Sequence, residues 1–208
     1  MKYYPVSMDV SGKRCVVVGG GRIAQRRIAT LLDYGAQVRM VTPVATDELR
    51  TLATSGKVAW VNAAYQSAHL EGAFLVVAAT DVRQTNAAVV RDAQGRNLLV
   101  TSVDAPEEGN FISPAQVVRG ELAFTISTSG LSPTLASVIR EDIEAAYGPE
   151  WADLTRIVGR IRHLLKERHA SEEERRAAIR SLLADDGVWD AIRDGNMAEA
   201  EALARRCL

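Results

Sequence analysis

Near its N-terminus the chain carries the stretch Val16-Val-Val-Gly-Gly-Gly-Arg-Ile-Ala24, which fits the pattern G-x-G-x-x-A. The run of β-branched residues before it predicts a strand, and the residues after it predict a helix. Gly19 permits a tight turn, Gly21 lets the backbone approach a pyrophosphate without a Cβ, and Ala24 allows close packing of helix on strand. The start of the helix would supply free N–H groups and positive charge for the phosphates. In this context the pattern predicts a dinucleotide-binding turn; the alternative is a glycine turn that binds nothing.

The acidic residue that usually completes such a site is missing. It is expected roughly 20 residues further on, after the second strand, where it binds the ribose hydroxyls. Here that position reads Val41-Thr-Pro-Val44, so Thr42 or backbone groups would take its place. Arg39 lies within the expected strand and does not indicate a 2′-phosphate site. The spacing alone therefore leaves NAD and NADP open.

Short β-branched runs alternate with helical patterns over the first two-thirds of the chain. Such alternation is typical of βαβ units around a parallel sheet, here a Rossmann-like α/β domain. The fourth run is so apolar that we expect it at the centre of the sheet, covered on both faces. The expected strands are residues 14–18, 37–41, 57–61, 74–79 and 97–103, and the expected helices are residues 22–34, 46–54 and 82–96.

The pattern changes after residue 112. Residues 114–119 and 121–126 predict a hairpin, and Ser132-Pro133 predicts the start of a helix that runs to about residue 147. From residue 151 onward only helices are credible. We therefore expect three domains, which comprise residues 1–112, 113–147 and 148–208.

Composition excludes several classes of protein. The 208 residues include 25 basic and 26 acidic side chains, and the net charge of −1 argues against a general nucleic-acid binder. The apolar run Ala73–Ala79 is far shorter than the roughly 20 residues of a membrane span, and no signal peptide is recognisable at the N-terminus. Cys15 and Cys207 are interpreted as reduced thiols of a cytoplasmic protein. Three His and two Cys without clustering predict no bound metal.

Polar residues follow two apolar strands at the edge where ligands bind in open α/β sheets. Thr80-Asp81 follows the fourth expected strand, and Asp104 follows the fifth. A carboxylate at this edge is a candidate general base, but it could equally bond the amides of its own turn. For Asp81 we expect a helix cap rather than a chemical role.

A second polar stretch, Ser127-Thr-Ser-Gly-Leu-Ser-Pro133, places four hydroxyls and a glycine before a helix start. Such a loop can hold an anion, for example a substrate carboxylate. The simpler interpretation is a helix capped by Ser132. We expect that cap to form and expect Ser127 and Thr128 to face the ligand.

Six short motifs occur together in a fixed order and spacing: Tyr4-Pro5, Val17-Val-Gly-Gly-Gly21, Ala78-Ala-Thr-Asp81, Val103-Asp-Ala-Pro106, Phe111-Ile-Ser-Pro114 and Ile126-Ser-Thr-Ser-Gly-Leu-Ser-Pro133. In this arrangement the chain resembles the precorrin-2 dehydrogenase family, which includes the dehydrogenase/ferrochelatase portion of siroheme synthase. The resemblance spans roughly residues 3–147, and the helical tail matches only in character.

The resemblance implies NAD-dependent oxidation of precorrin-2 to sirohydrochlorin, a step of siroheme or cobalamin synthesis. It implies a homodimer in which residues 113–147 form the dimerisation segment. It makes Asp104 the catalytic residue. The family usually lacks an acid after the second strand, which favours NAD here. The residues that would bind the nucleotide are Gly19, Gly21, Arg22, Ile23, Pro43, Val44 and Thr80.

Two other functions stay open at this point. Some members of the family also insert ferrous iron into sirohydrochlorin, so the chain could be a bifunctional dehydrogenase and ferrochelatase with ferrous or cobaltous ion as a co-substrate. Asp104 could serve both reactions. The third hypothesis is a non-catalytic module in which NAD binding alters a partner protein, because a Rossmann fold alone does not imply chemistry. A short-chain dehydrogenase is excluded, since the chain has no Tyr-x-x-x-Lys pair.

Overall fold

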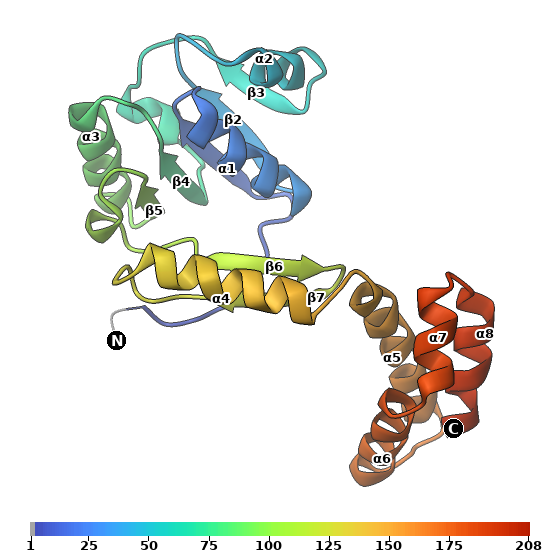
Figure 1. Ribbon diagram of the computed structural model, residues 1–208. Coiled ribbons are helices and arrows are strands. Elements are labelled where there is room, and N and C mark those ends of the chain that lie inside the picture. The colour runs from blue at the N-terminus through green and yellow to red at the C-terminus, as the bar shows by residue number, and fades with distance from the viewer. Residues whose placement is uncertain (1–2) are drawn as a thin grey trace. The chain divides into compact units, whose positions relative to one another are not determined.

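The computed structural model describes residues 3–208. The chain divides into two compact units, Met1–Ser113 and Pro114–Leu208, which we describe separately (Figure 1). The second unit holds both the hairpin and the C-terminal helices. The finer division of this part into residues 113–147 and 148–208 stays a prediction.

The first unit is built around a five-stranded parallel sheet in the order β3-β2-β1-β4-β5. This arrangement confirms the expected Rossmann-like α/β class. The observed elements begin and end within two residues of those expected. The strands are β1 (Arg14–Val18), β2 (Gln37–Val41), β3 (Val58–Val61), β4 (Leu75–Ala78) and β5 (Leu99–Ser102); the helices are α1 (Arg22–Asp33), α2 (Asp47–Thr54) and α3 (Arg83–Gln94), with 3₁₀ turns η1 (Ser67–Leu70) and η2 (Pro106–Glu108).

Two apolar cores cover the two faces of this sheet. One core joins Val17 and Met40 of the sheet to Ile28 of α1, and the other joins Val76 to Val89 of α3. All four residues of β4 are buried, as expected for a strand covered on both sides. However, β4 lies between β1 and β5, and the middle strand is β1, because the chain crosses over after β3. That crossover opens a crevice at the carboxyl ends of β1 and β4.

The second unit begins with an antiparallel hairpin, which packs against one helix and continues into four more. Its elements are β6 (Ala115–Arg119), β7 (Leu122–Ile126), α4 (Pro133–Ala146), α5 (Glu150–Glu167), α6 (Glu172–Leu183), α7 (Asp186–Arg193), α8 (Met197–Ala204) and η3 (Arg205–Cys207). The Nε atom of Arg119 donates to the carbonyl of Tyr147 at 2.8 Å, which ties the hairpin to the end of α4. The last helices share a core around Leu154 and Leu182. None of the helices in residues 3–208 is long and apolar enough to span a bilayer.

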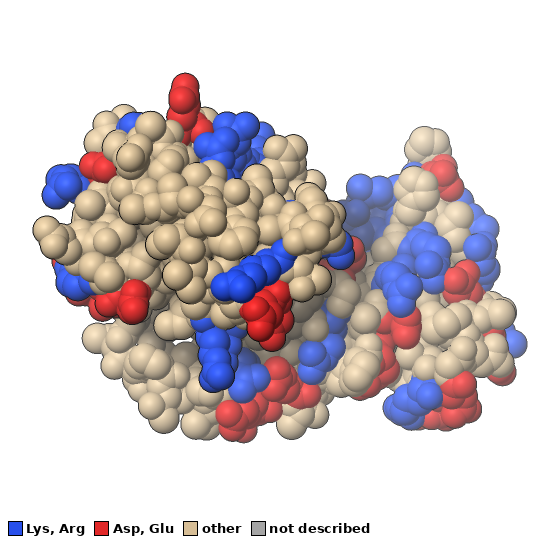
Figure 2. Space-filling view, turned by 90° about the horizontal axis from the view of Figure 1, so that it is seen from above, with Lys and Arg blue, Asp and Glu red and all other residues tan. Residues whose placement is uncertain are grey.

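Surface charge is mixed. On the face drawn in Figure 2, basic and acidic side chains are interspersed and do not gather into a broad area of one sign. Most of the ion pairs in the described chain join side chains that are more than a third exposed, for example Arg176 with Glu172. Exposed pairs of this kind contribute little to stability.

Candidate active site

The glycine turn is held tightly between two neighbouring loops. Gly19 has φ +127°, and a Cβ at this position would lie 2.2 Å from the carbonyl oxygen of Ala79. A Cβ on Gly20 would lie 2.1 Å from the carbonyl oxygen of Val44, whereas a Cβ on Gly21 would meet nothing within 4 Å. Gly21 is the N-cap of α1, and no side chain caps this helix. The turn therefore packs backbone against backbone on one side and presents an open helix start on the other.

A cavity of about 720 Å³ lies over this turn, at the crossover point of the sheet. Five of the seven residues predicted to bind the nucleotide line it: Gly19, Gly21, Pro43, Val44 and Thr80. The cavity also contains Tyr65, which sequence reasoning missed. The Tyr65 hydroxyl donates to Asp92 at 3.0 Å, and burial raises the pKa of this phenol, with a further rise from Asp92. The size and the glycine floor of this cavity suit a dinucleotide.

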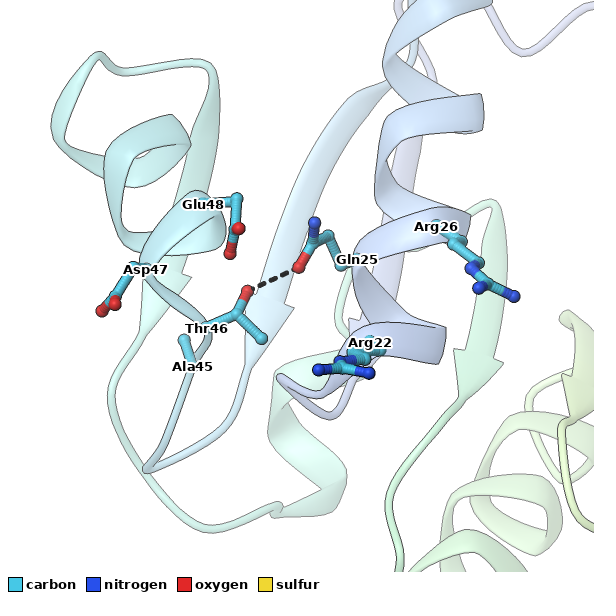
Figure 3. Close-up of a pocket in the computed structure, with 7 residues that line it drawn as sticks. All are labelled: Arg22, Gln25, Arg26, Ala45, Thr46, Asp47 and Glu48. Carbon is cyan, nitrogen blue, oxygen red and sulfur yellow. Dashed lines mark hydrogen bonds between the residues drawn. The ribbon is translucent and has the colours of Figure 1, made fainter.

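Arg22, a sixth predicted residue, lines a neighbouring cavity of about 540 Å³ between the first turns of α1 and α2 (Figure 3). There the Thr46 hydroxyl donates to Oε1 of Gln25 at 2.8 Å and caps α2. Asp47 and Glu48 line the side of the cavity that belongs to α2. The seventh, Ile23, is 52% exposed on the first turn of α1. The second cavity thus has cationic and anionic walls.

The loop after β2 uses its polar groups internally. Thr42, expected to serve for the missing acid, is buried, and its hydroxyl donates to the carbonyl of Val44 at 2.7 Å. Its carbonyl accepts a bond from Nε1 of Trp60 at 2.9 Å. These bonds fix the exposed Pro43–Val44 turn, which forms one rim of the larger cavity.

The loop after β4 corrects one expectation. Asp81 does not cap α3: the N-cap is Val82, and no side chain caps the helix. The turn is held instead by Asn86, which is fully buried. Its Oδ1 accepts bonds from the amide and the hydroxyl of Thr80 at 3.1 and 2.7 Å, and its Nδ2 donates to the Thr80 carbonyl at 3.0 Å. Asp81 is left exposed at the lining of the cavity.

Asp104 lies just after β5, with 30% of its side chain exposed. The Ser102 hydroxyl donates to its Oδ1 at 2.5 Å, and Nε of Arg83 lies 3.8 Å from its Oδ2. Burial alone would raise the pKa of Asp104, but hydrogen bonds from Ser102, from Asn86 and from its own backbone amide, together with the charge of Arg83, hold the pKa below its usual value. The carboxylate is therefore ionised at neutral pH and can accept a proton. The hydrogen bond from its own amide also agrees with the alternative role of Asp104, in which the carboxylate only bonds the amides of its own turn.

Arg83 binds a second carboxylate as well. Its guanidinium forms an ion pair with Glu108 of η2 in addition to the contact with Asp104. The hydrogen bond to Glu108 raises the pKa of Arg83, so this residue is a permanent cation. Sequence reasoning missed Arg83 and Asn86, because both lie on α3, about 20 residues before Asp104 in the chain. It also missed the role of Ser102, which lies two residues before Asp104.

The hydroxyl loop belongs to the second unit. Ser132 caps α4 as expected, with its Oγ accepting from the amide of Leu135 at 3.1 Å. The Thr128 hydroxyl accepts from the amide of Ser132 at 3.1 Å, and the Ser127 hydroxyl accepts from the amide of Ser129 at 3.1 Å. Both hydroxyls thus shape their own loop. A role for Ser127 and Thr128 in substrate binding stays a prediction.

Within residues 3–208, no three His, Cys, Asp or Glu side chains gather in a way that could hold a metal ion. Cys15 and Cys207 are free thiols. Burial raises the pKa of Cys15 to about 11, which makes it an unreactive core residue.

Comparison with known proteins decides the family. A family model described as "Putative NAD(P)-binding" matches residues 6–115, which include the glycine turn and Asp104. The chain belongs to this NAD(P)-binding family. A second model, described as sirohaem biosynthesis protein central, matches residues 119–146, the segment of the hairpin and α4.

Individual relatives agree with these models. The chain is 38% identical over 204 residues to siroheme synthase 1 of Aeromonas salmonicida, a match that covers 98% of this chain and 44% of the relative. It is 34% identical over 202 residues to siroheme synthase of Chromobacterium violaceum, covering 97% of this chain and 43% of the relative. The chain therefore spans less than half the length of these curated relatives. Among solved structures, SirC, precorrin-2 dehydrogenase, is 28% identical with a TM-score of 0.78, covering 98% of this chain and 100% of that one. These matches confirm the resemblance inferred from the six motifs.

Proposed function

We propose that this chain is an NAD-dependent precorrin-2 dehydrogenase, which oxidises precorrin-2 to sirohydrochlorin in siroheme or cobalamin biosynthesis. One observation carries the proposal: Asp104 is a partly exposed carboxylate whose pKa is held low by groups that include Asn86, and Asn86 is hydrogen-bonded to Thr80, which lines the nucleotide cavity. A carboxylate linked in this way to a nucleotide cavity can act as a base beside the cofactor. Similarity to SirC over nearly the whole of both chains supports the same substrate.

The residues at the glycine turn fit the proposed cofactor. Gly21 leaves room for the pyrophosphate at the start of α1, and Arg22 and Ile23 follow it with their amides in the first helical turn. Pro43, Val44 and Thr80 would flank the nucleotide. We prefer NAD to NADP because no basic residue follows β2 before α2.

The proposed reaction removes two hydrogens from the tetrapyrrole. The nicotinamide, when bound, supplies a hydride acceptor. Asp104 accepts the accompanying proton. A carboxylate of low pKa is adequate for this task, because loss of a hydride leaves positive charge on the macrocycle and makes the departing proton acidic. Ser127 and Thr128 would bind substrate carboxylates.

A homodimer is part of the proposal. In the second unit, Leu131, Leu135 and Val138 are 90%, 51% and 49% exposed. Leu135 and Val138 are three residues apart and so lie on one side of α4, and Leu131 lies in the loop just before this helix. Exposed apolar side chains grouped on one face are typical of an interaction surface.

Anaerobic incubation of the protein with precorrin-2 and NAD tests the proposal. We expect NADH and sirohydrochlorin to form in equal amounts. If NAD binds and neither product forms, the dehydrogenase is excluded and the NAD-sensing module is favoured. A second arm mixes sirohydrochlorin with ferrous or cobaltous ion: faster metal insertion than in buffer would add the chelatase reaction.

A further inference from the structure

We propose that Asn86 and Ser102 are positioning residues, which hold the carboxylate of Asp104 in one orientation beside the nucleotide cavity. The inference rests on the proposed function, since it assigns both residues to the base of that reaction. Neither residue touches the open cavity itself. Each acts through a neighbour, Asn86 through Thr80 and Asp104, and Ser102 through Asp104 alone.

Ser102 is the last residue of β5 and is fully buried. Its hydroxyl lies 2.5 Å from Oδ1 of Asp104, a distance typical of a hydroxyl donating to a charged oxygen. The strand fixes the backbone of Ser102, because β5 pairs with β4 at Ala78 and Ser102. The hydroxyl therefore offers Asp104 a rigid donor, and no other role is visible for a polar side chain buried at this point.

Asn86 holds the loop after β4 through three hydrogen bonds to Thr80. Its Oδ1 accepts two bonds from Thr80, and its Nδ2 donates one bond to the Thr80 carbonyl. The Asn86 side chain also favours the charged form of Asp104 and lowers the pKa of that carboxyl. An amide is the side chain that this place requires, because it both accepts from Thr80 and donates to it without placing a charge beside Asp104. A carboxylate of the same shape would lose both donors and repel Asp104.

The charged groups around Asp104 affect its charge more than its orientation. Arg83 of α3 is the cation that faces it, and Glu107 and Glu108 of η2 interact with this same guanidinium. Half of the Arg83 side chain is exposed, at 51%. An exposed arginine adds charge but little rigidity. The two buried neutral side chains are therefore the parts of the network that define where the carboxylate points.

Three variants test this inference: Ser102→Ala, Ser102→Thr and Asn86→Asp. For Ser102→Ala we expect kcat to fall roughly tenfold or more, with the KM for precorrin-2 and the Kd for NAD within about twofold of the parent. The acidic limb of the kcat/KM profile should move up by about one pH unit, because Asp104 loses a donor to its charged form. Ser102→Thr keeps the hydroxyl, so its kcat and the acidic limb of its kcat/KM profile should match those of the parent. Asn86→Asp should lower kcat more than Ser102→Ala does. Ser137→Ala, on α4, is the matched control.

The background of Asp104→Asn separates positioning from structure. If Ser102 acts through the carboxylate, Ser102→Ala should cause no further loss in that background. An equal loss in both backgrounds, or an unchanged pH profile, would overturn the inference. Carbon-13 NMR titration of the Asp104 carboxyl in the protein without substrate gives a readout that needs no turnover. An unshifted pKa of Asp104 in Ser102→Ala refutes the positioning role, whereas an inactive parent protein refutes only the proposed function.

Discussion

The Nε atom of Arg83 lies 3.8 Å from Oδ2 of Asp104, and the same guanidinium forms an ion pair with Glu108. One cation is thus shared between two carboxylates, one at the end of β5 and one in the following turn. Because Arg83 is shared, its electrostatic attraction to each carboxylate is weaker than in a single pair. All three side chains are also partly exposed. The contact therefore lowers the pKa of Asp104 but contributes little to the stability of the fold.

Arg83→Gln should change the pH dependence of the reaction and leave stability nearly unchanged. Loss of the cation raises the pKa of Asp104, so the acidic limb of kcat/KM should move to higher pH. In the parent the low pKa of Asp104 adds to the free energy of unfolding at neutral pH, and this contribution is lost as the pH falls through that pKa. The free energy of unfolding of the variant should therefore fall less on acidification than that of the parent. At neutral pH thermal unfolding should differ by no more than about 1 kcal/mol. Arg91→Gln, also on α3, is the control; an equal shift there would contradict the assignment.

Asp104→Asn should abolish most turnover and spare the cofactor site. The amide has nearly the same shape but cannot accept the proton, so we expect kcat to fall by about 10²–10⁴-fold. Calorimetric titration with NAD should give a Kd close to that of the parent, because Asp104 does not line the nucleotide cavity. Full activity in this variant would remove Asp104 from the mechanism and favour its alternative role in the turn.

Two glycine variants should separate folding from nucleotide binding. Gly19→Ala forces a side chain into positive φ and onto the Ala79 carbonyl, so we expect unfolding at lower temperature, with a loss of about 1–3 kcal/mol or more. Gly21→Ala meets open space and should unfold like the parent. It should nevertheless bind NAD far more weakly, because the added methyl group occupies the approach of the pyrophosphate. Unimpaired NAD binding in Gly21→Ala would contradict the proposed placement of the cofactor.

Leu135→Asp should dissociate the proposed homodimer. Leu135 is 51% exposed on α4, so an aspartate is tolerated in the isolated chain but is costly at an apolar interface. Sedimentation equilibrium should show a shift from dimer to monomer, with a far-ultraviolet circular dichroism spectrum like that of the parent. Thr134→Asp places the same charge one residue away on an exposed polar position and should remain dimeric. A monomeric parent protein would refute the proposed assembly.

Much of the fold follows from local pattern. The glycine turn, the alternation of strands with helices and the cap at Ser132 each depend on residues within a few positions of one another, so they were predicted from the sequence. The unbroken apolar run at residues 74–79 also predicted that β4 is covered on both faces. Five of the seven predicted nucleotide residues line one cavity because a parallel sheet brings the ends of its strands to one edge.

The expectation for Asp81 failed for a reason that sequence cannot show. Position before a helix favoured a cap, but Asn86 reaches back from inside α3 and bonds all three polar groups of Thr80. That competition depends on how the helix start is oriented over the sheet. Tyr65 was missed in the same way, since its partner Asp92 is 27 residues away on another element.

By itself, the order of residues determined that a dinucleotide turn opens a Rossmann-like sheet and that Asp104 follows its fifth strand, because backbone propensity and side-chain spacing act over short distances. Only the tertiary structure decided that Asn86 and Arg83 of α3 approach that carboxylate. Their partners lie up to 25 residues apart, as Arg83 and Glu108 do, and such groups meet only when packing of the core brings the strand ends and helix starts together.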